Sequence, residues 1–398
     1  MTESPMNKVQ KSFFSPLLIK RIKKFRSFKR GYYSLIIIGT AYLLSFFSEF
    51  IINDNALIIK FDGKTFITLY SDVSLKKYIF AKAIETKETY SKYKNLTHTD
   101  TLNLKDEKLS FLKDEYKRYD RIKKDFDNHR VLSNIFEEQN RGDWALLAPY
   151  PYGPNENLLD ELGDRNPPTS PDNEHPLGTD DRGRDVLARL VYGFRIYMTF
   201  SLLLTLASYF IGIFFGALLG YYGGKVDFLG LRFIEIWASI PFLFTVMVLS
   251  SIMIPNFTIL IVILSLFGWI SMARYIRAEF LREKSNDYVQ AAIAIGVNDR
   301  KIIFSHILPN SLTPVISFLP FTIISGIAVL ASLDFLGFGL PEPTPSWGQL
   351  LSQGVSNLSS WWLTFSPMAA MFVTLMLIAF IGEAVREALD PKVYSRMR

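Results

Sequence analysis

The sequence predicts an all-α membrane protein with six transmembrane helices and a large mixed insertion outside the membrane between helices 1 and 2. Hydrophobic residues make up 49% of the 398 residues and are gathered in long stretches with little or no charge. A helix needs about 20 apolar residues to cross the ~30 Å hydrocarbon core of a bilayer. The stretches long enough to do so are residues 31–52, 196–224, 236–273, 302–333 and 343–382.

One of these stretches, residues 236–273, is too long for a single transmembrane helix. Pro255 and Asn256 lie near its middle and are typical of a turn. We therefore expect two helices joined by a tight turn on the outer side, which brings the count to six. A basic arm, residues 1–30, precedes the first helix, and residues 196–398 form the membrane core with the other five.

The distribution of basic residues predicts the orientation in the membrane. The first 30 residues hold nine Lys and Arg and one acid, Glu3. Residues 274–301 hold six more basic residues, whereas residues 334–367 hold none. Short cytoplasmic loops are enriched in Lys and Arg, so both termini and the loop 274–311 are expected in the cytoplasm. The net charge of +6 then reflects orientation and contacts with anionic lipids, and no nucleic-acid partner is expected.

The insertion, residues 53–195, is predicted to be mixed in structure. Residues 56–69 have the pattern of a β-hairpin that turns at Asp62 and Gly63. Apolar side chains at three- and four-residue steps predict a helix or helical hairpin within residues 76–140, either solvated or carrying a docking face. They are Leu109, Leu112, Tyr116, Tyr119, Ile122 and Phe126.

The end of the insertion leads into the second transmembrane stretch. Residues 149–176 are rich in proline and predict an extended connector. A helix beginning at Val186 follows, and Thr179 or Asp180 is expected to cap it. We expect this helix to lie along the outer membrane surface before the second span.

The most specific motif lies in the predicted cytoplasmic loop. Two adjacent alanines and a glycine give a helix surface that a partner can approach closely, and basic residues flank it. The motif consists of Gln290, Ala291, Ala292 and Gly296, followed by His306, Leu308 and Pro309. The basic residues are Arg274, Arg277, Arg282, Arg300 and Lys301.

Two further motifs lie on the predicted outer side. One precedes the second membrane stretch and consists of His175, Gly178, Thr179, Asp180, Gly183, Arg184, Asp185 and Arg189. The other follows the fifth helix and consists of Asp334, Gly337, Gly339, Pro345 and Trp347. Asp334 is expected to be solvated at the outer end of its helix. Trp347, like Trp361 and Trp362, suits a membrane–water interface.

These motifs resemble a known family. The segment Gln290–Pro309 resembles the EAA loop of ABC-importer permeases, with Gln290 where Glu is usual and His306 where Ile is usual. The two outer motifs resemble segments of dipeptide and oligopeptide permeases of the C type. Residues 52–63 and 382–391 further resemble Yej-type permeases of microcin C and oligopeptide importers. The resemblance covers residues 175–390 and the first span.

The resemblance implies the fold of type I ABC importers and a place in the bacterial inner membrane. It implies three kinds of protein partner: a second, related permease, ATPase subunits that dock on the loop 290–309, and a periplasmic binding protein that delivers peptides. ATP and Mg would be bound by the ATPase subunits, so the chain itself would be a transport subunit without a cofactor and without enzymatic activity.

The sequence also weighs against other sites and functions. A phosphate-binding loop needs the pattern G-x-x-x-x-G-K-[ST], but Ile58 stands where the first glycine of a loop ending at Gly63 would be, and Val226 follows Gly224-Lys225. The histidine and aspartates of residues 175–185 lack the spacing of a known metal motif. Two alternatives stay open: an ion-coupled secondary transporter, and a membrane-anchored protein whose outer domain is the functional part.

Overall fold

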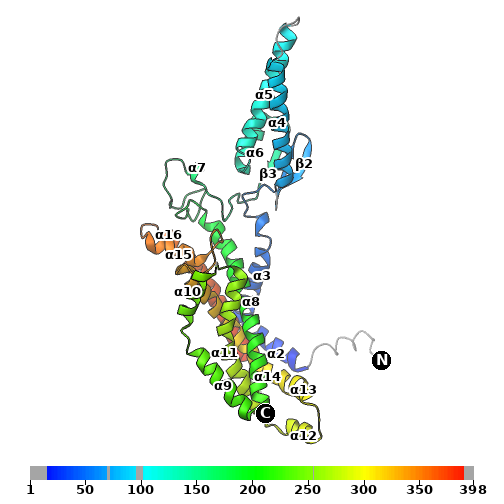
Figure 1. Cartoon of the computed structure of the whole chain (residues 1–398), viewed down its shortest axis with the longest axis vertical. Helices are drawn as coiled ribbons and strands as arrows, with labels where there is room; N and C mark the ends of the chain where they lie inside the picture. The colour runs from blue at the N-terminus through cyan, green and yellow to red at the C-terminus, as the bar shows by residue number, and fades with distance from the viewer. Residues whose placement is uncertain (1–15, 70–71, 96–101, 254, 390–398) are drawn as a thin grey trace, which may run out of the picture. The chain divides into compact units, whose positions relative to one another are not determined.

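The computed structural model describes residues 16–69, 72–95, 102–253 and 255–389 (Figure 1). Most of the predicted basic arm, residues 1–15, therefore lies outside the described residues. The chain divides into two compact units. We call residues 1–45 with 190–398 the helical unit, and residues 46–189 the insertion unit.

The helical unit is built from long apolar helices. Its elements are α2 (Pro16–Ser27), α3 (Lys29–Ser45), α8 (Val186–Tyr222), α9 (Gly224–Ala238), α10 (Phe242–Ile252), α11 (Phe257–Lys284), α12 (Asp287–Ala294), α13 (Asp299–Lys301), the π-helix η2 (Ile302–Ile307), α14 (Leu308–Phe335), α15 (Trp347–Ser356) and α16 (Trp361–Leu389). In the described residues, four helical segments are long and apolar enough to cross a membrane: α8, α11, residues 299–335 and α16. The bent pair α9–α10 would make a fifth.

The predicted turn at Pro255 and Asn256 is confirmed. Helix α10 ends at Ile252 and α11 begins at Phe257. The side chain of Asn256 accepts a hydrogen bond from the backbone N–H of Ile259 at 2.8 Å, which satisfies one of the free donors at the start of α11.

A second break interrupts the same region and was not predicted. Helices α9 and α10 meet at an angle of 69°, on either side of Pro241. Proline has no backbone N–H and disfavours helical geometry at the residue before it, so the helix stops at Ala238 and restarts at Phe242.

Helix α8 corrects two predictions. It is one continuous helix of 37 residues, about 55 Å long at 1.5 Å per residue, so no separate surface helix precedes the second span. Its cap is neither Thr179 nor Asp180: Oδ1 of Asp185 accepts the backbone N–H of Ala188 at 2.7 Å. Gly193 lies where the predicted surface helix would meet the second span, and one glycine costs too little free energy to end a helix.

Three glycines on one face of α8 allow α11 to pack closely against it. A Cβ atom added to Gly212 would lie 2.8 Å from the carbonyl oxygen of Trp269, and one added to Gly220 would lie 2.7 Å from that of Arg277. A Cβ atom added to Gly216, between them, would lie 2.5 Å from the carbonyl oxygen of Ala273. Glycines at intervals of four residues are typical of helices that cross in a membrane, and α8 and α11 run side by side (Figure 1).

The insertion unit combines a small sheet with helices. Strands β1 (Ile58–Phe61), β2 (Lys64–Ile67) and β3 (Trp144–Leu146) form an antiparallel sheet of order β2-β1-β3. Its other elements are η1 (Ser48–Phe50), α4 (Val73–Asn95), α5 (Leu102–Lys124), α6 (His129–Gln139) and α7 (Leu159–Leu162). The predicted hairpin turn is confirmed: Asp62 has φ 50° and Gly63 has φ 72°, and a two-residue turn of type I′ requires positive φ at both of its central residues.

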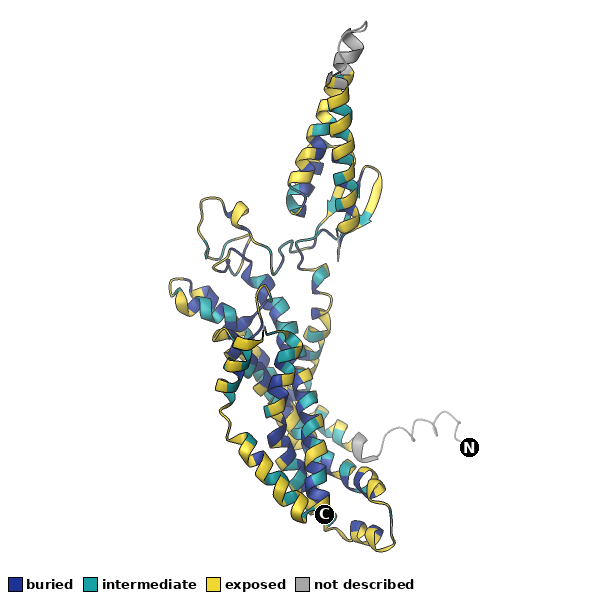
Figure 2. Ribbon diagram, in the orientation of Figure 1, coloured by how far each residue is buried: buried dark blue, intermediate teal, exposed yellow. Residues whose placement is uncertain are grey.

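The predicted apolar stripe forms part of the core of this unit. Tyr119, Ile122 and Phe126 are buried against β1 and α4, while Leu109, Leu112 and Tyr116 are half-buried between α4 and α5. A helical hairpin is therefore confirmed. Exposed side chains cover most of its length, and buried ones gather at the end next to the sheet (Figure 2).

Candidate functional site

The loop that carries the most specific motif is shorter than predicted. Helix α11 continues through Arg274, Arg277 and Arg282 to Lys284, because nothing in this stretch breaks a helix. The loop proper therefore begins after Lys284, with α12 as its central element.

Helix α12 has one buried face and one exposed face. Val289 and Ala292 are buried against α8, α11 and η2. On the face about 100° around the helix, Tyr288 is 43% exposed and Ile295, just beyond the helix end, is 80% exposed, and Ala291 between them is exposed too. Positions 288, 291 and 295 follow the spacing of one helix face. The sequence predicted a helix surface that a partner can approach closely. In the structure, Ala292 lies on the buried face of α12 and Ala291 on the exposed face.

Gly296 ends α12 with a tight left-handed turn. Its φ is 76°. The backbone N–H of Val297 donates to the carbonyl of Ala292 at 3.1 Å, and that of Gly296 donates to Ile293 at 3.0 Å. This pair of bonds defines a Schellman motif, in which the residue after the helix needs positive φ and glycine is the usual choice.

Gln290 has a role that a glutamate could not fill. Its Nε2 donates a 2.7 Å hydrogen bond to the carbonyl oxygen of Lys284, the last residue of α11. The last carbonyls of a helix lack partners within the helix, and an ionised carboxylate can only accept hydrogen bonds. Gln290 thus fastens α12 to the end of α11.

The second half of the loop motif lies where η2 joins α14. The backbone N–H of Leu308 donates to the carbonyl of Ile303, five residues earlier, which is π-helical geometry. His306 is half-buried, and its carbonyl accepts from Asn310 Nδ2 at 3.1 Å and from the hydroxyl of Tyr288 at 3.3 Å. Pro309, at the start of α14, has no N–H to donate.

The five predicted basic residues fall into three groups. Arg277 forms a bidentate ion pair with Asp227 of α9, and Arg282 forms an ion pair with Glu279 at 2.6 Å. Arg300 and Lys301 are exposed on α13. Arg274 lines a cavity and has no hydrogen-bond or ion-pair partner among the described residues.

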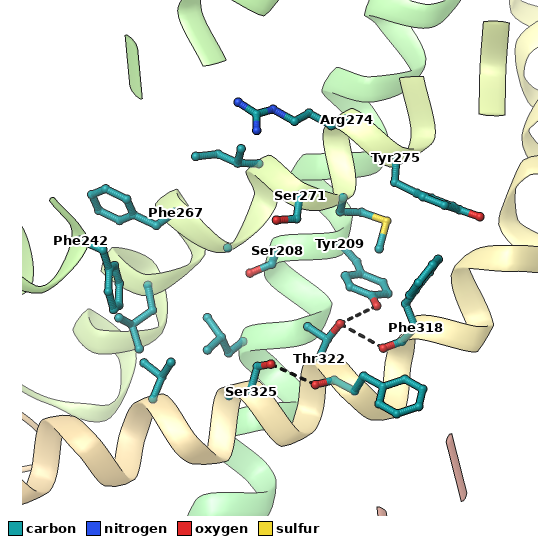
Figure 3. A pocket seen from close by; sticks show the side chains of 18 of the residues that line it. Ser208, Tyr209, Phe242, Phe267, Ser271, Arg274, Tyr275, Phe318, Thr322 and Ser325 are labelled. Atoms are coloured by element: carbon teal, nitrogen blue, oxygen red, sulfur yellow. Dashed lines mark hydrogen bonds between the residues drawn. The ribbon is translucent and has the colours of Figure 1, made fainter. Parts of the chain in front are cut away.

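This cavity was not predicted. Its volume is about 730 Å³, and helices α8, α10, α11 and α14 form its walls (Figure 3). Aromatic side chains make up much of the lining, and hydroxyl groups break the apolar surface; Tyr209 and Thr322 bond to each other at 2.8 Å. The sequence signal for this cavity was the presence of single serines and threonines, such as Ser208 and Ser271, in apolar stretches. Whether these side chains meet at one cavity depends on helix packing.

The outer motif after α14 is a buried hydrogen-bond cluster. Asp334 is 2% exposed, so the expectation that it is solvated is wrong. Its Oδ2 accepts from Tyr197 at 2.6 Å and from Ser346 at 2.5 Å, and its Oδ1 accepts from the N–H of Leu340 at 2.7 Å. Three hydrogen bonds offset the cost of burying a carboxylate.

The other residues of this motif fold the chain around Asp334. Trp347 is 1% exposed, so it is not an interfacial tryptophan; its ring stacks on Tyr197, and its N–H donates to the carbonyl of Leu190 at 3.0 Å. Gly337 turns the chain with φ 80°. Gly339 lies against Asp334 where no side chain would fit, and Pro345 is buried.

The outer motif before α8 is also an internal network. Asp180 binds the side chain of Arg184 at 2.7 Å, and Asp185 binds His175 at 2.9 Å. The guanidinium of Arg189 donates to the carbonyl of Pro154 at 3.0 Å. The two glycines, Gly178 and Gly183, have positive φ, and Thr179 bonds to Thr169. All the polar members are at least 96% buried, so they hold the chain in shape and do not face a ligand.

Burial shifts the pKa of several groups in the insertion unit. It lowers the pKa of His129, whose Nδ1 accepts the backbone N–H of Ala56 at 2.8 Å. It raises the pKa of Glu156 against the opposing effect of Arg130. Burial and the hydrogen bond to Asp185 raise the pKa of Tyr150. Among the described residues, no group of His, Asp and Glu is arranged to hold a metal ion.

Comparison with known proteins places these features in a family. The sequence profile of the family described as "Binding-protein-dependent transport system inner membrane component" matches residues 212–395. The chain is 40% identical to the inner membrane ABC transporter permease protein YejE of Escherichia coli K12, over 96% of this chain and 98% of that protein. It is 35% identical to the peptidoglycan transport system permease protein YejE of Agrobacterium fabrum, over 97% and 96%.

Other proteins are similar over a smaller part of this chain. The dipeptide transport system permease protein DppC of Bacillus subtilis is 33% identical over 72% of this chain and 87% of its own length. A solved structure of the MetNI methionine ABC transporter in an inward-facing conformation overlaps 51% of this chain with a TM-score of 0.44 and 19% identity. The similarity to the two YejE proteins extends over nearly the full length of each chain. The chain therefore belongs to the family of ABC transporter permeases of the inner membrane.

Proposed function

We propose that this chain is the permease subunit of an ATP-driven importer that takes up peptides delivered by an extracytoplasmic binding protein. The relatives support the substrate class, because they include permeases named for dipeptide and oligopeptide transport. The observation that carries the proposal is the two-faced helix α12, whose inner face is buried in the helical unit and whose outer face is apolar and exposed.

The outer face of α12 is proposed to dock into an ATPase subunit. Exposed apolar side chains at the end of a helix hairpin favour burial against a protein partner. Tyr288 and Gln290 tie α12 to α14 and α11, so a displacement of α12 would pass to both helices. ATP and Mg would be bound by the ATPase subunits, and this chain would carry no cofactor.

The proposed membrane topology has six spans. They are α3, α8, the bent pair α9–α10, α11, the segment 299–335 and α16. Helix α3 has 17 residues, about 25 Å, which is a little less than the hydrocarbon thickness. The basic residues before α3 and around α12 favour a cytoplasmic position for both termini and α12, and residues 46–189 would then lie outside.

The proposed partners follow from this topology. A second permease of related sequence would complete the pathway, as the family membership of this chain suggests. The binding protein would contact the insertion unit and the segment between α14 and α15. Anionic lipids would contact the basic helix α2.

Cysteine crosslinking tests the docking assignment. The chain has no cysteine, so a single cysteine at Ile295 can be paired with single cysteines on the ATPase subunit in membranes. We expect an ATP-dependent crosslink at Ile295 and also at Ala291. Ala292 is the matched control: it lies one residue away but is 7% exposed, so its cysteine should not react.

Uptake completes the test. Vesicles that contain the assembled transporter should accumulate a labelled tripeptide only when ATP is present inside. A correctly inserted Ile295→Cys chain that crosslinks to no ATPase residue would contradict the docking assignment. ATP-dependent transport of other solutes but no peptide would contradict the substrate class alone.

A further inference from the structure

Helix α11 presents a glycine and two polar side chains to the cavity, and the three residues lie in line along the helix. Gly268, Ser271 and Arg274 are three residues apart and all line the cavity, so they share one face of the helix. In Figure 3, Ser271 lies between Ser208 and Arg274. This line runs from the middle of α11 to the end of its apolar stretch.

Arg274 is the charged group of this line and differs from its neighbours on α11. It is the first charged residue after the uncharged stretch that ends at Ala273. Arg277 and Arg282 are held by Asp227 and Glu279. Arg274 has no such partner among the described residues, and the lining of the cavity includes no Asp or Glu.

Ser208 provides a second, independent sign of a ligand. It is 2% exposed, and its hydroxyl has no hydrogen-bond partner among the described residues. Gly268 faces it from α11, and a Cβ atom there would lie 2.5 Å from Ser208 Oγ. Burying a hydroxyl without a partner costs roughly 1–3 kcal/mol, so a group that bonds to it from the cavity would be favoured.

The remaining lining suits a chain of varied side chains. Phe242, Phe267 and Phe318 offer broad apolar surfaces to the cavity (Figure 3). The volume of about 730 Å³ lies within the range of roughly 300–1,000 Å³ that ligand cavities occupy. The cavity therefore combines one fixed cation with walls that can accept many apolar groups.

We propose that Arg274, assisted by Ser271, binds the C-terminal carboxylate of a peptide in transit, and that Ser208 bonds to a backbone group of the same peptide. This inference rests on the proposed function and adds the group that the pathway recognises. The C-terminal carboxylate is the one anion that all linear peptides share, and it is ionised at neutral pH. The planar guanidinium matches a carboxylate with two parallel hydrogen bonds.

The test compares two forms of one peptide in vesicles that contain the assembled transporter. One form is a labelled tripeptide with neutral side chains and a free C-terminal carboxylate, and the other is its C-terminal amide. For each form, uptake by a variant is divided by uptake by the wild type, so that any preference of the binding protein cancels. The variants are Arg274→Ala, Arg274→Lys and, as the control, Arg232→Ala, which removes a cation from an exposed ion pair with Glu235.

We expect Arg274→Ala to lower uptake of the free acid by about tenfold or more, the effect of losing a charge-assisted hydrogen bond, and to leave the ratio for the amide near one. Arg274→Lys should retain part of the uptake of the free acid, and Arg232→Ala should change neither ratio. The membrane level of each variant and its basal ATP hydrolysis show that the complex has assembled.

Two results would overturn the assignment of Arg274. Equal losses for the acid and the amide would show that the arginine acts on the structure or on gating, and no loss for either would show that it does not meet the peptide. If the wild type accumulates neither form in an ATP-dependent way, the proposed peptide substrate is wrong, and this inference fails with it.

Discussion

The hydroxyl of Tyr197 donates a 2.6 Å hydrogen bond to the carboxylate of Asp334, although 137 residues separate them in the sequence. The same hydroxyl accepts the backbone N–H of Gly348 at 3.0 Å. One side chain of α8 thus joins the end of α14 to the start of α15, and the chain between these two helices is held from both sides.

Removing the hydroxyl of Tyr197 should destabilise the helical unit. Tyr197→Phe leaves a buried carboxylate and a backbone N–H each short of one partner, at a cost of roughly 1–3 kcal/mol. We expect a lower thermal unfolding midpoint in detergent. Tyr222→Phe is the control, because Tyr222 lies on the same helix but is 52% exposed. Equal midpoints for the two variants would show that the cluster does not stabilise the fold.

The glycine face of α8 gives a prediction about packing. Alanine at Gly216 would bring its Cβ to 2.5 Å from the carbonyl of Ala273 and push α8 and α11 apart, at a cost of about 1–3 kcal/mol. The same change at Gly39 of α3, where no atom lies within 4 Å of the added Cβ, should be neutral or stabilising, because alanine favours helix. Unfolding of both variants in detergent checks the difference in sign.

Substitutions at Gly296 that resist positive φ should impair transport without preventing membrane insertion. Gly296→Val should abolish peptide uptake while membrane insertion persists, because a β-branched residue resists positive φ and α12 would lose its C-terminal turn. Gly296→Asn should keep most of the uptake, since asparagine tolerates this conformation. Uptake and membrane level of both variants are the measurements, and normal uptake by the valine variant would contradict the role of the turn.

His129 predicts a pH dependence of the insertion unit. Its folded-state pKa lies below the ordinary value of 6.5 because the ring is buried. The unfolded chain therefore binds a proton at a higher pH than the folded chain does, so stability is fully present above pH 6.5 and falls as the pH drops below it. Protonation of Nδ1 would also break its bond from Ala56.

Hydrogen exchange in the full-length chain measures this effect. Between pH 7 and pH 5, protection of the β1 amides, corrected for intrinsic exchange, should fall in the wild type. It should change less in His129→Asn, whose side-chain oxygen can still accept the amide of Ala56 but does not titrate. The same fall in both proteins would assign it to other groups, such as the carboxylates.

Local patterns in the sequence were enough for the hairpin at Asp62-Gly63 and the helix break at Pro255-Asn256, since turn chemistry acts over a few residues. The stripe that ends at Phe126 was also predictable, because helical spacing reveals which face is buried. The sequence revealed the two outer motifs, but it did not predict that their residues are buried. Asp334 and Trp347 look like surface residues until Tyr197, from a distant helix, supplies their partner.

The cavity could not be predicted from the sequence either. Ser208 and Arg274 come from helices that meet only because Gly212, Gly216 and Gly220 let α8 and α11 approach. Sequence alone placed Arg274 with the loop, whereas the unbroken helix to Lys284 turns it toward the cavity. Packing determines the contacts between helices that are far apart in the chain, and the pattern of residues within one helix does not reveal them.

The π-helix η2 takes up one residue within the helix that runs from α13 into α14. Its wider turn holds about one residue more than an α-helical turn, whereas one residue added to a regular α-helix rotates everything after it by about 100°. Because the wider turn absorbs that residue, α13 and α14 keep the relative phase of one continuous α-helix, and Thr322 and Ser325 of α14 line the cavity. Shortening Ile302–Ile307 by one residue should therefore give a regular α-helix with both hydroxyls still on the cavity wall, whereas the same deletion within α14 before Thr322 would turn them away.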